Sequence, residues 1–301
     1  MKTLNLRVAT LNIGGGEKTF EESNHDTQQS RLKALEMLIK RLDADVLCLQ
    51  EVSQYIDADG ANHSLMDKIS DVGKYQHAFY GKTVSMETHM QVKKDVMVRG
   101  IFNDWWNWSK GNAIHARVPF ARLGDPNRSG LPRNIPIFRP LAYEGNRDTD
   151  PRAALLTRLK EAPFPFVSTL HLTTLVGERL PDATPLIKEK AHLMRFQQVS
   201  RLLDLVRANI LEKNEPLIVA GDFNAMADEH CINHLLASVP EFVRLVPDND
   251  GPTHPDVERA VDHIFFYPRQ RLVSYTCHIE TCDLSRRASD HLPVVADLEI
   301  K

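Results

Sequence analysis

The sequence alternates short apolar runs with longer amphipathic segments, and this alternation is what most constrains the fold. The apolar runs have the length of strands, and polar residues bound them. They cover residues 6–13, 44–52, 164–172, 217–222, 261–267 and 292–300. Residues 27–42 and 188–213 carry apolar side chains at helical spacing, with Thr27 placed to cap the first helix. A strand follows each helix, so the sequence predicts an α/β protein with several buried strands.

The chain of 301 residues has no internal repeat and no long linker rich in Pro, Gly or Ser. We therefore predict a single domain over residues 1–301, with a loop-rich insertion around 76–150. This insertion is rich in aromatic, basic and proline residues, and it contains Trp105, Trp106 and Trp108. Long loops inside a compact domain commonly form the walls of a binding site.

Charge and composition exclude several classes of protein. With 37 Lys and Arg against 40 Asp and Glu, the net charge is −3, so the chain lacks the positive field that coats duplex DNA by charge alone. No apolar stretch approaches the roughly 18 residues that a membrane-spanning helix needs, and the first residues do not form a signal peptide. The 4 cysteines are too few and too scattered for a disulfide scaffold. We expect a cytoplasmic protein with no transmembrane segment.

Acid, amide and imidazole side chains occur at the ends of the predicted strands, where an α/β fold normally builds its site. A single carboxylate at such a place is usually a helix cap or a solvated edge residue. Six strand ends that all carry such groups indicate a functional site. These residues are Asn12, Glu51, His171, Asp222, Asn224, Asp262, Asp290 and His291.

The run 217–222 ends in Gly221 and Asp222, and Asn224 follows two residues after Asp222. Alternate side chains of an extended segment face the same way, so both polar groups can reach one ligand. Asp222 can orient or deprotonate a water, and Asn224 can contact a phosphoryl oxygen without adding negative charge. The alternative is an Asx turn that only closes a loop.

Glu51 ends the run 44–52, and Asn12 ends the run 6–13. A hard cation such as Mg²⁺ keeps several waters and needs only one or two protein carboxylates. Glu51 assisted by Asn12 therefore fits magnesium better than zinc. The nearest grouping of zinc-type ligands, Cys277 and His278 with Cys282, lacks a second ligand pair.

Two histidines complete the candidate site. His291 precedes the last apolar run, and Asp262 is the expected partner that orients its ring. A histidine held by a carboxylate can stabilise a phosphate intermediate or pass a proton to it near neutral pH. His171 supplies a second imidazole, for which the alternative is a hydrogen-bonded core histidine.

These segments occur in the order seen in the endonuclease/exonuclease/phosphatase superfamily, the deoxyribonuclease I-like phosphoesterases, which the chain resembles over nearly its whole length. The Gly-Asp-Phe-Asn and Ser-Asp-His segments, with Gln-Glu upstream, are the most specific markers. The matching segments are Ala9-Thr10-Leu11-Asn12, Leu49-Gln50-Glu51-Val52, Thr169-Leu170-His171-Leu172, Gly221-Asp222-Phe223-Asn224, Val261-Asp262-His263-Ile264-Phe265 and Ser289-Asp290-His291-Leu292-Pro293-Val294.

The resemblance implies a four-layered α/β sandwich, in which two mixed β-sheets lie face to face and helices flank them. It implies Mg²⁺ as cofactor, with Mn²⁺ as a substitute, held by Glu51 with Asn12 beside it and assisted by Asp290. It also implies in-line attack of water on a phosphate ester with no covalent enzyme intermediate. The catalytic residues that it implies are Asp222, Asn224, His171, Asp262 and His291.

A phosphodiesterase acting on nucleic acid or a nucleotide is the leading interpretation, because Trp105, Trp106 and Trp108 can stack on unpaired bases of a single strand. A sphingomyelinase-like lipid-headgroup phosphodiesterase is the alternative, in which the same tryptophans contact a membrane interface. A small-molecule phosphatase is another alternative. A binding module that has lost the chemistry is the least favoured, because the constellation of site residues is intact.

Overall fold

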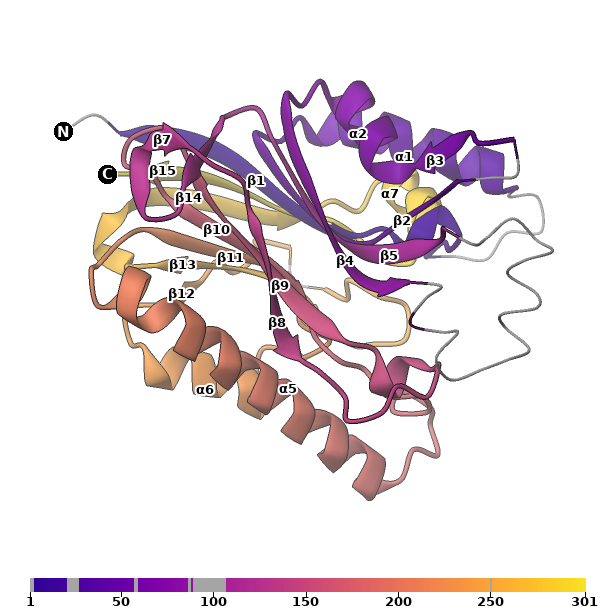
Figure 1. Cartoon of the computed structure of the whole chain (residues 1–301). Helices are drawn as coiled ribbons and strands as arrows, with labels where there is room; N and C mark the ends of the chain where they lie inside the picture. Colours follow the sequence, from indigo (N-terminus) through magenta and orange to yellow (C-terminus); the bar gives the residue numbers. More distant parts are fainter. Residues whose placement is uncertain (1–2, 21–26, 57–58, 86–87, 89–106, 250) are drawn as a thin grey trace.

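The computed structural model describes residues 3–20, 27–56, 59–85, 88, 107–249 and 251–301. Two mixed β-sheets lie face to face, and helices cover both outer faces (Figure 1). The seven-stranded sheet has the order β14-β15-β1-β2-β5-β4, with β3 paired to β2. The eight-stranded sheet has the order β12-β13-β11-β10-β9-β6-β7, with β8 paired to β9. The four-layered α/β sandwich expected from the sequence is confirmed.

The seven-stranded sheet consists of β1 (Leu4–Asn12), β2 (Val46–Ile56), β3 (Asn62–Ser64), β4 (His77–Ser85), β5 (Ser109–Ala116), β14 (Leu272–Ile279) and β15 (Val294–Ile300). The eight-stranded sheet consists of β6 (Phe120–Arg122), β7 (Asp125–Ser129), β8 (Arg133–Phe138), β9 (Arg152–Leu159), β10 (Phe166–His171), β11 (Leu217–Asp222), β12 (Val243–Arg244) and β13 (Asp262–Tyr267). Residues 76–150 thus supply β4 and β5 to one sheet and β6, β7 and β8 to the other, in addition to loops.

The helices divide between the two outer faces. The first sheet is covered by α1 (Gln28–Leu42), α2 (Leu65–Gly73) and α7 (Asp283–Ala288), and the second by α5 (Pro185–Val206) and α6 (His230–Ser238). The hydroxyl oxygen of Thr27 accepts a hydrogen bond from the Ser30 backbone N–H at 3.2 Å, so the expected N-cap of α1 is present. No helix among the described residues is both long and apolar enough to cross a membrane.

Three apolar layers hold the sandwich together. Between the sheets, Val8 and Ile114 of the first sheet share a core with Val167 and Ile218 of the second. The two outer cores lie under the helices, one including Leu35 and Leu38 of α1 and the other including Val199 and Leu203 of α5. Removing this surface from water is the main stabilising contribution, at about 25 cal/mol per Å² of apolar area.

Strand pairing brings the predicted site residues to one end of the sandwich. β10 and β11 run parallel, and their register places His171 beside Asp222. β13 runs antiparallel to β11, so Asp262 at its start lies on the other side of Asp222. β1 and β2 are also parallel, and Asn12 pairs with Gln50, the residue before Glu51.

Candidate active site

A cleft of about 230 Å³ opens where the ends of both sheets meet. Of the eight polar residues predicted to form a site, seven line this cleft, and Asp262 lies behind His291. The seven are Asn12, Glu51, His171, Asp222, Asn224, Asp290 and His291. The sequence-based selection therefore identifies one continuous surface.

The carboxylate of Asp222 is the point on which the polar contacts of the cleft converge. Its side chain is 1% exposed, and its Oδ2 accepts a hydrogen bond from Nδ2 of Asn12 at 3.0 Å. The Nε2 atoms of His171 and His291 lie 3.4 Å and 3.7 Å from the same oxygen. One carboxylate oxygen is thus surrounded by nitrogen atoms from strands of both sheets.

The ring of His171 has a defined tautomer. Nη1 of Arg152 lies 3.1 Å from its Nδ1, and because a guanidinium only donates, Nδ1 must accept and the proton is on Nε2. Burial and the nearby charge of Arg152 together lower the pKa of His171 to about 3, so the ring is neutral at pH 7. A neutral imidazole N–H therefore faces the cleft beside Asp222.

His291 is held in the opposite charge state. Its Nδ1 donates to Oδ2 of Asp262 at 2.9 Å, and Asp262 has no exposed side-chain surface. Burial lowers the pKa of His291, but the charges of Asp262 and Asp222 and the hydrogen bond to Asp262 outweigh burial and raise this pKa to about 9. A cationic N–H thus faces the cleft, 3.7 Å from Oδ2 of Asp222.

Glu51 reaches the cleft through a local break in β2. The register between β2 and β5 shifts between Leu49 and Val52, and Glu51 has a φ of 55°. Gln50 points between the sheets, where its Nε2 donates to Oγ1 of Thr169 at 2.9 Å, so regular alternation would turn Glu51 away from the second sheet. The bulge and the left-handed backbone instead aim it into the cleft.

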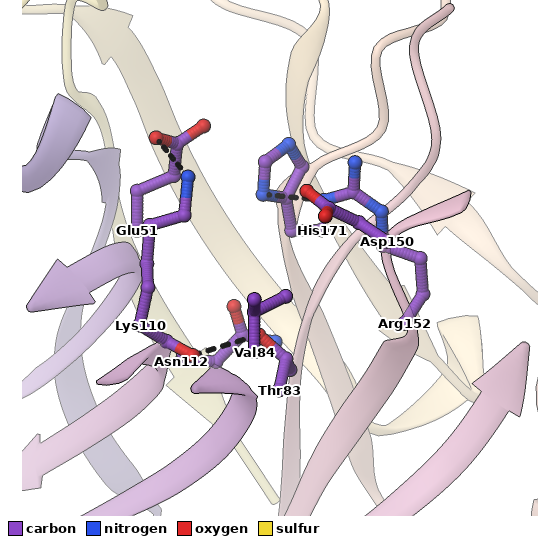
Figure 2. Close-up of a pocket in the computed structure, with 9 residues that line it drawn as sticks. Glu51, Thr83, Val84, Lys110, Asn112, Asp150, Arg152 and His171 are labelled. Atoms are coloured by element: carbon purple, nitrogen blue, oxygen red, sulfur yellow. Dashed lines mark hydrogen bonds and ion pairs between the residues drawn. The ribbon is translucent and has the colours of Figure 1, made fainter. Parts of the chain in front are cut away.

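Lys110 of β5 lies beside Glu51, with 3.1 Å between Nζ and Oε2. Figure 2 shows this pair on the first sheet facing His171 and Arg152 on the second. Burial raises the pKa of Glu51, but the charges of Lys110 and Lys18 and the hydrogen bond from Lys110 outweigh burial and hold this pKa well below its usual range. Glu51 is therefore a carboxylate throughout the neutral range.

Asp222 and Asn224 both close an Asx turn and line the cleft, which are the two alternatives that the sequence left open. The backbone N–H of Asn224 donates to Oδ1 of Asp222 at 2.8 Å, which is an Asx turn, while Oδ2 of Asp222 faces the cleft. Asn224 has a φ of 48°, a conformation that asparagine tolerates. Its Nδ2 donates to the Leu172 carbonyl at 2.9 Å and contacts Asp222 Oδ2 at 3.4 Å, and its Oδ1 accepts from Arg179.

The residues proposed for a metal have the donor chemistry of a hard cation. Glu51 and Asp290 offer carboxylate oxygens and Asn12 an amide oxygen, which suit Mg²⁺ or Mn²⁺. Oδ2 of Asp290 lies 3.3 Å from Nζ of Lys18, so a lysine stands beside each carboxylate. Two tighter groups of potential metal ligands also occur among the described residues, namely His254 with Asp290 and His291, and Asp222 with Asp262 and His291.

Several cleft residues were not singled out as site residues from the sequence. Among them are four Lys and Arg side chains, together with the carboxylates of Glu17 and Asp150. The cationic and imidazole residues of this group are Lys18, Lys110, Arg147, Arg179 and His254, and Trp108, one of the three tryptophans considered for base stacking, lines the cleft as well. Arg152 of β9 also lines the cleft.

Two buried polar residues of α5 support the site from behind. Arg195 of α5 is 1% exposed, and its guanidinium binds Glu178 at 2.7 Å and Glu229 at 2.8 Å. Gln198 donates from Nε2 to the Thr173 hydroxyl at 2.6 Å. These contacts tie α5 to the loops after β10 and β11, which carry Arg179 and Asn224. Arg117 pairs with Asp43 and is not part of the cleft lining.

Comparison with known proteins identifies the family. The model of the endonuclease/exonuclease/phosphatase family matches residues 9–291. The chain belongs to this family. No curated protein gives a significant match to the sequence.

Solved structures of endonuclease/exonuclease/phosphatase proteins share the fold of this chain. One from Beutenbergia cavernae has a TM-score of 0.67 at 21% identity, over 98% of this chain and 72% of that chain. Truncated TDP2 from Caenorhabditis elegans has a TM-score of 0.59 at 15% identity, over 98% of this chain and 97% of that chain. The human Nocturnin catalytic domain has a TM-score of 0.59 at 17% identity, over 100% of this chain and 97% of that chain.

Proposed function

We propose that this endonuclease/exonuclease/phosphatase family member hydrolyses phosphate esters by in-line attack of water, with Mg²⁺ as cofactor and Mn²⁺ as a substitute. A phosphodiester of nucleic acid or a nucleotide is the proposed substrate. The observation that carries this proposal is the convergence of two imidazole N–H groups, from His171 and His291, on the carboxylate of Asp222. A carboxylate for the water and N–H donors for the phosphoryl oxygens are what such a reaction requires.

In this proposal each residue acts from its observed position. Asp222 accepts a proton from the attacking water and orients it, while Asn12 holds Oδ2 of Asp222 in place. The Nε2–H groups of His171 and His291 donate to phosphoryl oxygens, and Asp262 keeps His291 cationic. The 3.4 Å contact from Asn224 to Asp222 is long, and a substrate oxygen would replace it.

The divalent cation would be held by Glu51 and Asp290 with Asn12, and it would supply Lewis-acid polarisation of a phosphoryl oxygen. Together with the carboxylates of Glu17, Glu51, Asp150, Asp222 and Asp290, the cleft is lined by five cationic side chains. They are Lys18, Lys110, Arg147, Arg152 and Arg179. Each of these cationic groups can pair with a phosphate oxygen at short range, and a bound divalent cation would offset the carboxylates.

Trp108 supports a nucleic acid or nucleotide as the substrate. Its half-buried side chain lines the cleft, at the place where a base attached to the bound phosphate could stack. Trp105 and Trp106 lie outside the described residues. A lipid-headgroup phosphodiester is the second candidate substrate, and a comparison of substrates distinguishes it from the first.

A hydrolysis panel with Mg²⁺, Mn²⁺ or excess EDTA tests the proposal. The substrates are single-stranded DNA, RNA, a dinucleotide, sphingomyelin vesicles and a phosphomonoester such as glucose 6-phosphate. We expect metal-dependent cleavage, fastest on a nucleic acid or nucleotide diester. Preference for the vesicles would show that lipid headgroups are the substrate. Cleavage of none of the five substrates would contradict the proposed phosphoesterase activity.

A further inference from the structure

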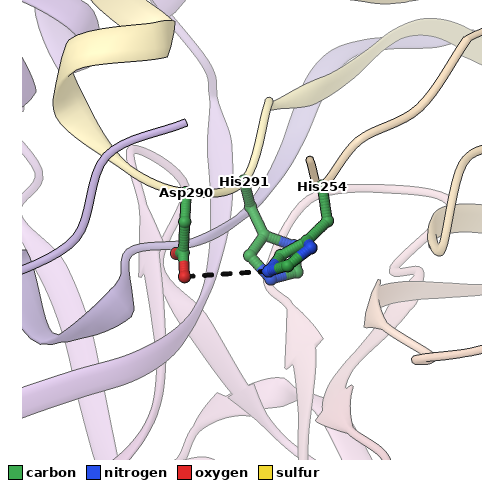
Figure 3. Close-up of side chains that lie close together, drawn as sticks. All are labelled: His254, Asp290 and His291. Atoms are coloured by element: carbon green, nitrogen blue, oxygen red, sulfur yellow. Dashed lines mark ion pairs between the residues drawn. The ribbon is translucent and has the colours of Figure 1, made fainter. Parts of the chain in front are cut away.

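His254, in the loop before β13, is a part of the cleft that the proposed reaction does not use. Its side chain is 12% exposed, and its ring packs against the ring of His291 at 4.7 Å between centroids and 64° between planes. Figure 3 shows His254 beside His291, facing Asp290. The residue therefore borders the space between a proposed metal ligand and the cationic histidine.

The backbone around His254 is firmly anchored. The hydroxyl oxygen of Thr253 accepts hydrogen bonds from the N–H groups of Val261 and Asp262 at 3.0 Å and 3.2 Å. The Thr253 carbonyl accepts from the N–H of Leu292 at 2.8 Å. The loop is thus tied to the segments that carry Asp262 and His291, which fixes the position of His254 relative to both.

A further hydrogen bond sets the tautomer of His254. The backbone N–H of Asp256 donates to Nδ1 of His254 at 3.1 Å, so Nδ1 is an acceptor and the ring proton is on Nε2. Nε2 lies 3.8 Å from Oδ2 of Asp290, which is too long for a hydrogen bond. Nε2 therefore carries an N–H that faces the cleft without a direct bond to Asp290.

We propose that His254 is a substrate-contacting residue whose Nε2–H donates to an oxygen of the phosphoryl group bound beside His291. This inference rests on the proposed function, since it supplies a third imidazole donor to the same phosphate. The geometric grouping of His254, Asp290 and His291 also has the composition of a transition-metal site. The donor role is favoured because a metal ligand needs a bare Nε2, whereas the Asp256 contact places the proton there.

The test measures orthophosphate binding by isothermal titration calorimetry in Mg²⁺ buffer. His254→Phe keeps an aromatic ring against His291 but removes the donor, whereas His254→Gln keeps an N–H donor. His230→Phe changes an exposed histidine of α6 outside the cleft and serves as the control. Circular dichroism and thermal unfolding of each variant show whether it is folded.

Loss of a hydrogen bond to a charged group corresponds to roughly tenfold weaker binding or more, which we expect for His254→Phe. His254→Gln is expected within about threefold of the unmodified protein, and His230→Phe unchanged. Unchanged binding in a folded His254→Phe variant would overturn the inference and leave the proposed function standing. Failure of the unmodified protein to bind orthophosphate would contradict both.

A parallel titration with Zn²⁺ separates the two roles of His254. In the donor role, His254→Gln and His254→Phe bind Zn²⁺ as the unmodified protein does. If both variants lose Zn²⁺ binding while orthophosphate affinity stays unchanged, His254 is a metal ligand and the inference is wrong.

Discussion

Asp262 holds His291 by a hydrogen bond of 2.9 Å between Oδ2 and Nδ1, in a place where neither side chain is more than 5% exposed. The pair is built from two elements far apart in the chain, since Asp262 begins β13 and His291 precedes β15. Because the carboxylate is buried, its charge acts on His291 with little screening. The two residues should therefore behave as one functional unit.

A double-mutant cycle tests this unit. His291→Ala should lower kcat by several orders of magnitude, because it removes the cationic donor. Asp262→Asn combined with His291→Ala should cost little more than His291→Ala alone. Rates measured on bis-p-nitrophenyl phosphate, with folding checked by circular dichroism, give the coupling. Additive losses would show that the two residues act separately.

The role of Glu51 is tested through metal dependence. Excess EDTA should abolish hydrolysis, Mg²⁺ or Mn²⁺ should restore it, and Ca²⁺ should support it poorly. Glu51→Gln keeps the size of the side chain but removes its charge, so the Mg²⁺ concentration for half-maximal rate should rise at least tenfold, on the order of the loss of one charged ligand. An unchanged Mg²⁺ requirement in Glu51→Gln would refute the assignment.

Because of the buried His115, we expect the free energy of unfolding to depend on pH. This dependence does not involve catalysis. Its ring is fully buried between β5 and α2, with Nε2 3.0 Å from the Met66 carbonyl, and burial lowers its pKa from 6.5 to about 4. Between these values the unfolded chain binds a proton that the folded protein excludes, so stability falls as the pH falls. The loss is about 3 kcal/mol below pH 4.

Urea unfolding of the unmodified protein and of His115→Gln between pH 4 and 7.5 measures this contribution. Glutamine can donate to the Met66 carbonyl but does not titrate in this range. The unmodified protein should lose more stability on acidification than the variant, since other buried histidines contribute equally to both. Parallel curves for the two proteins would rule out His115 as a source of the pH dependence.

Trp108 tests the proposed substrate class. Replacement by Ala should raise KM for a single-stranded oligonucleotide by about tenfold, on the scale of one base-stacking contact. Turnover of bis-p-nitrophenyl phosphate should be nearly unchanged, because this small diester needs only the reacting groups. Equal losses on both substrates would show that Trp108 supports the cleft structurally, and a selective loss on sphingomyelin vesicles would favour the lipid alternative.

The sequence alone predicts those features of the fold that depend on a local pattern of residues. Apolar runs of strand length located β11 at Leu217–Asp222, and Thr27 located the start of α1. The helix expected over 188–213 instead begins at Pro185 and gives way to a π-helical turn at Arg207. Within this helix Leu193 is 55% exposed, so an apolar residue at helical spacing need not face the sheet.

Other features depend on pairing between distant segments, so no local pattern contains them. The bulge that aims Glu51 is a mismatch between β2 and β5, and the tautomer of His171 is set by Arg152 from a neighbouring strand. Arg195 carries a charge but is buried between two glutamates. Its sequence context is that of a helix surface, and only the packing of α5 against the loops shows its structural role.

The rate of bis-p-nitrophenyl phosphate hydrolysis by Asp222→Asn, measured in saturating Mg²⁺, tests the central claim most directly. Asp228→Asn is the matched control, because Asp228 is an exposed aspartate paired with Arg259 outside the cleft lining. Asparagine keeps the shape of Asp222 but cannot accept a proton from water, so we predict a loss of several orders of magnitude in kcat with full activity in the control. A folded Asp222→Asn protein that hydrolyses the diester at the unmodified rate would contradict the account.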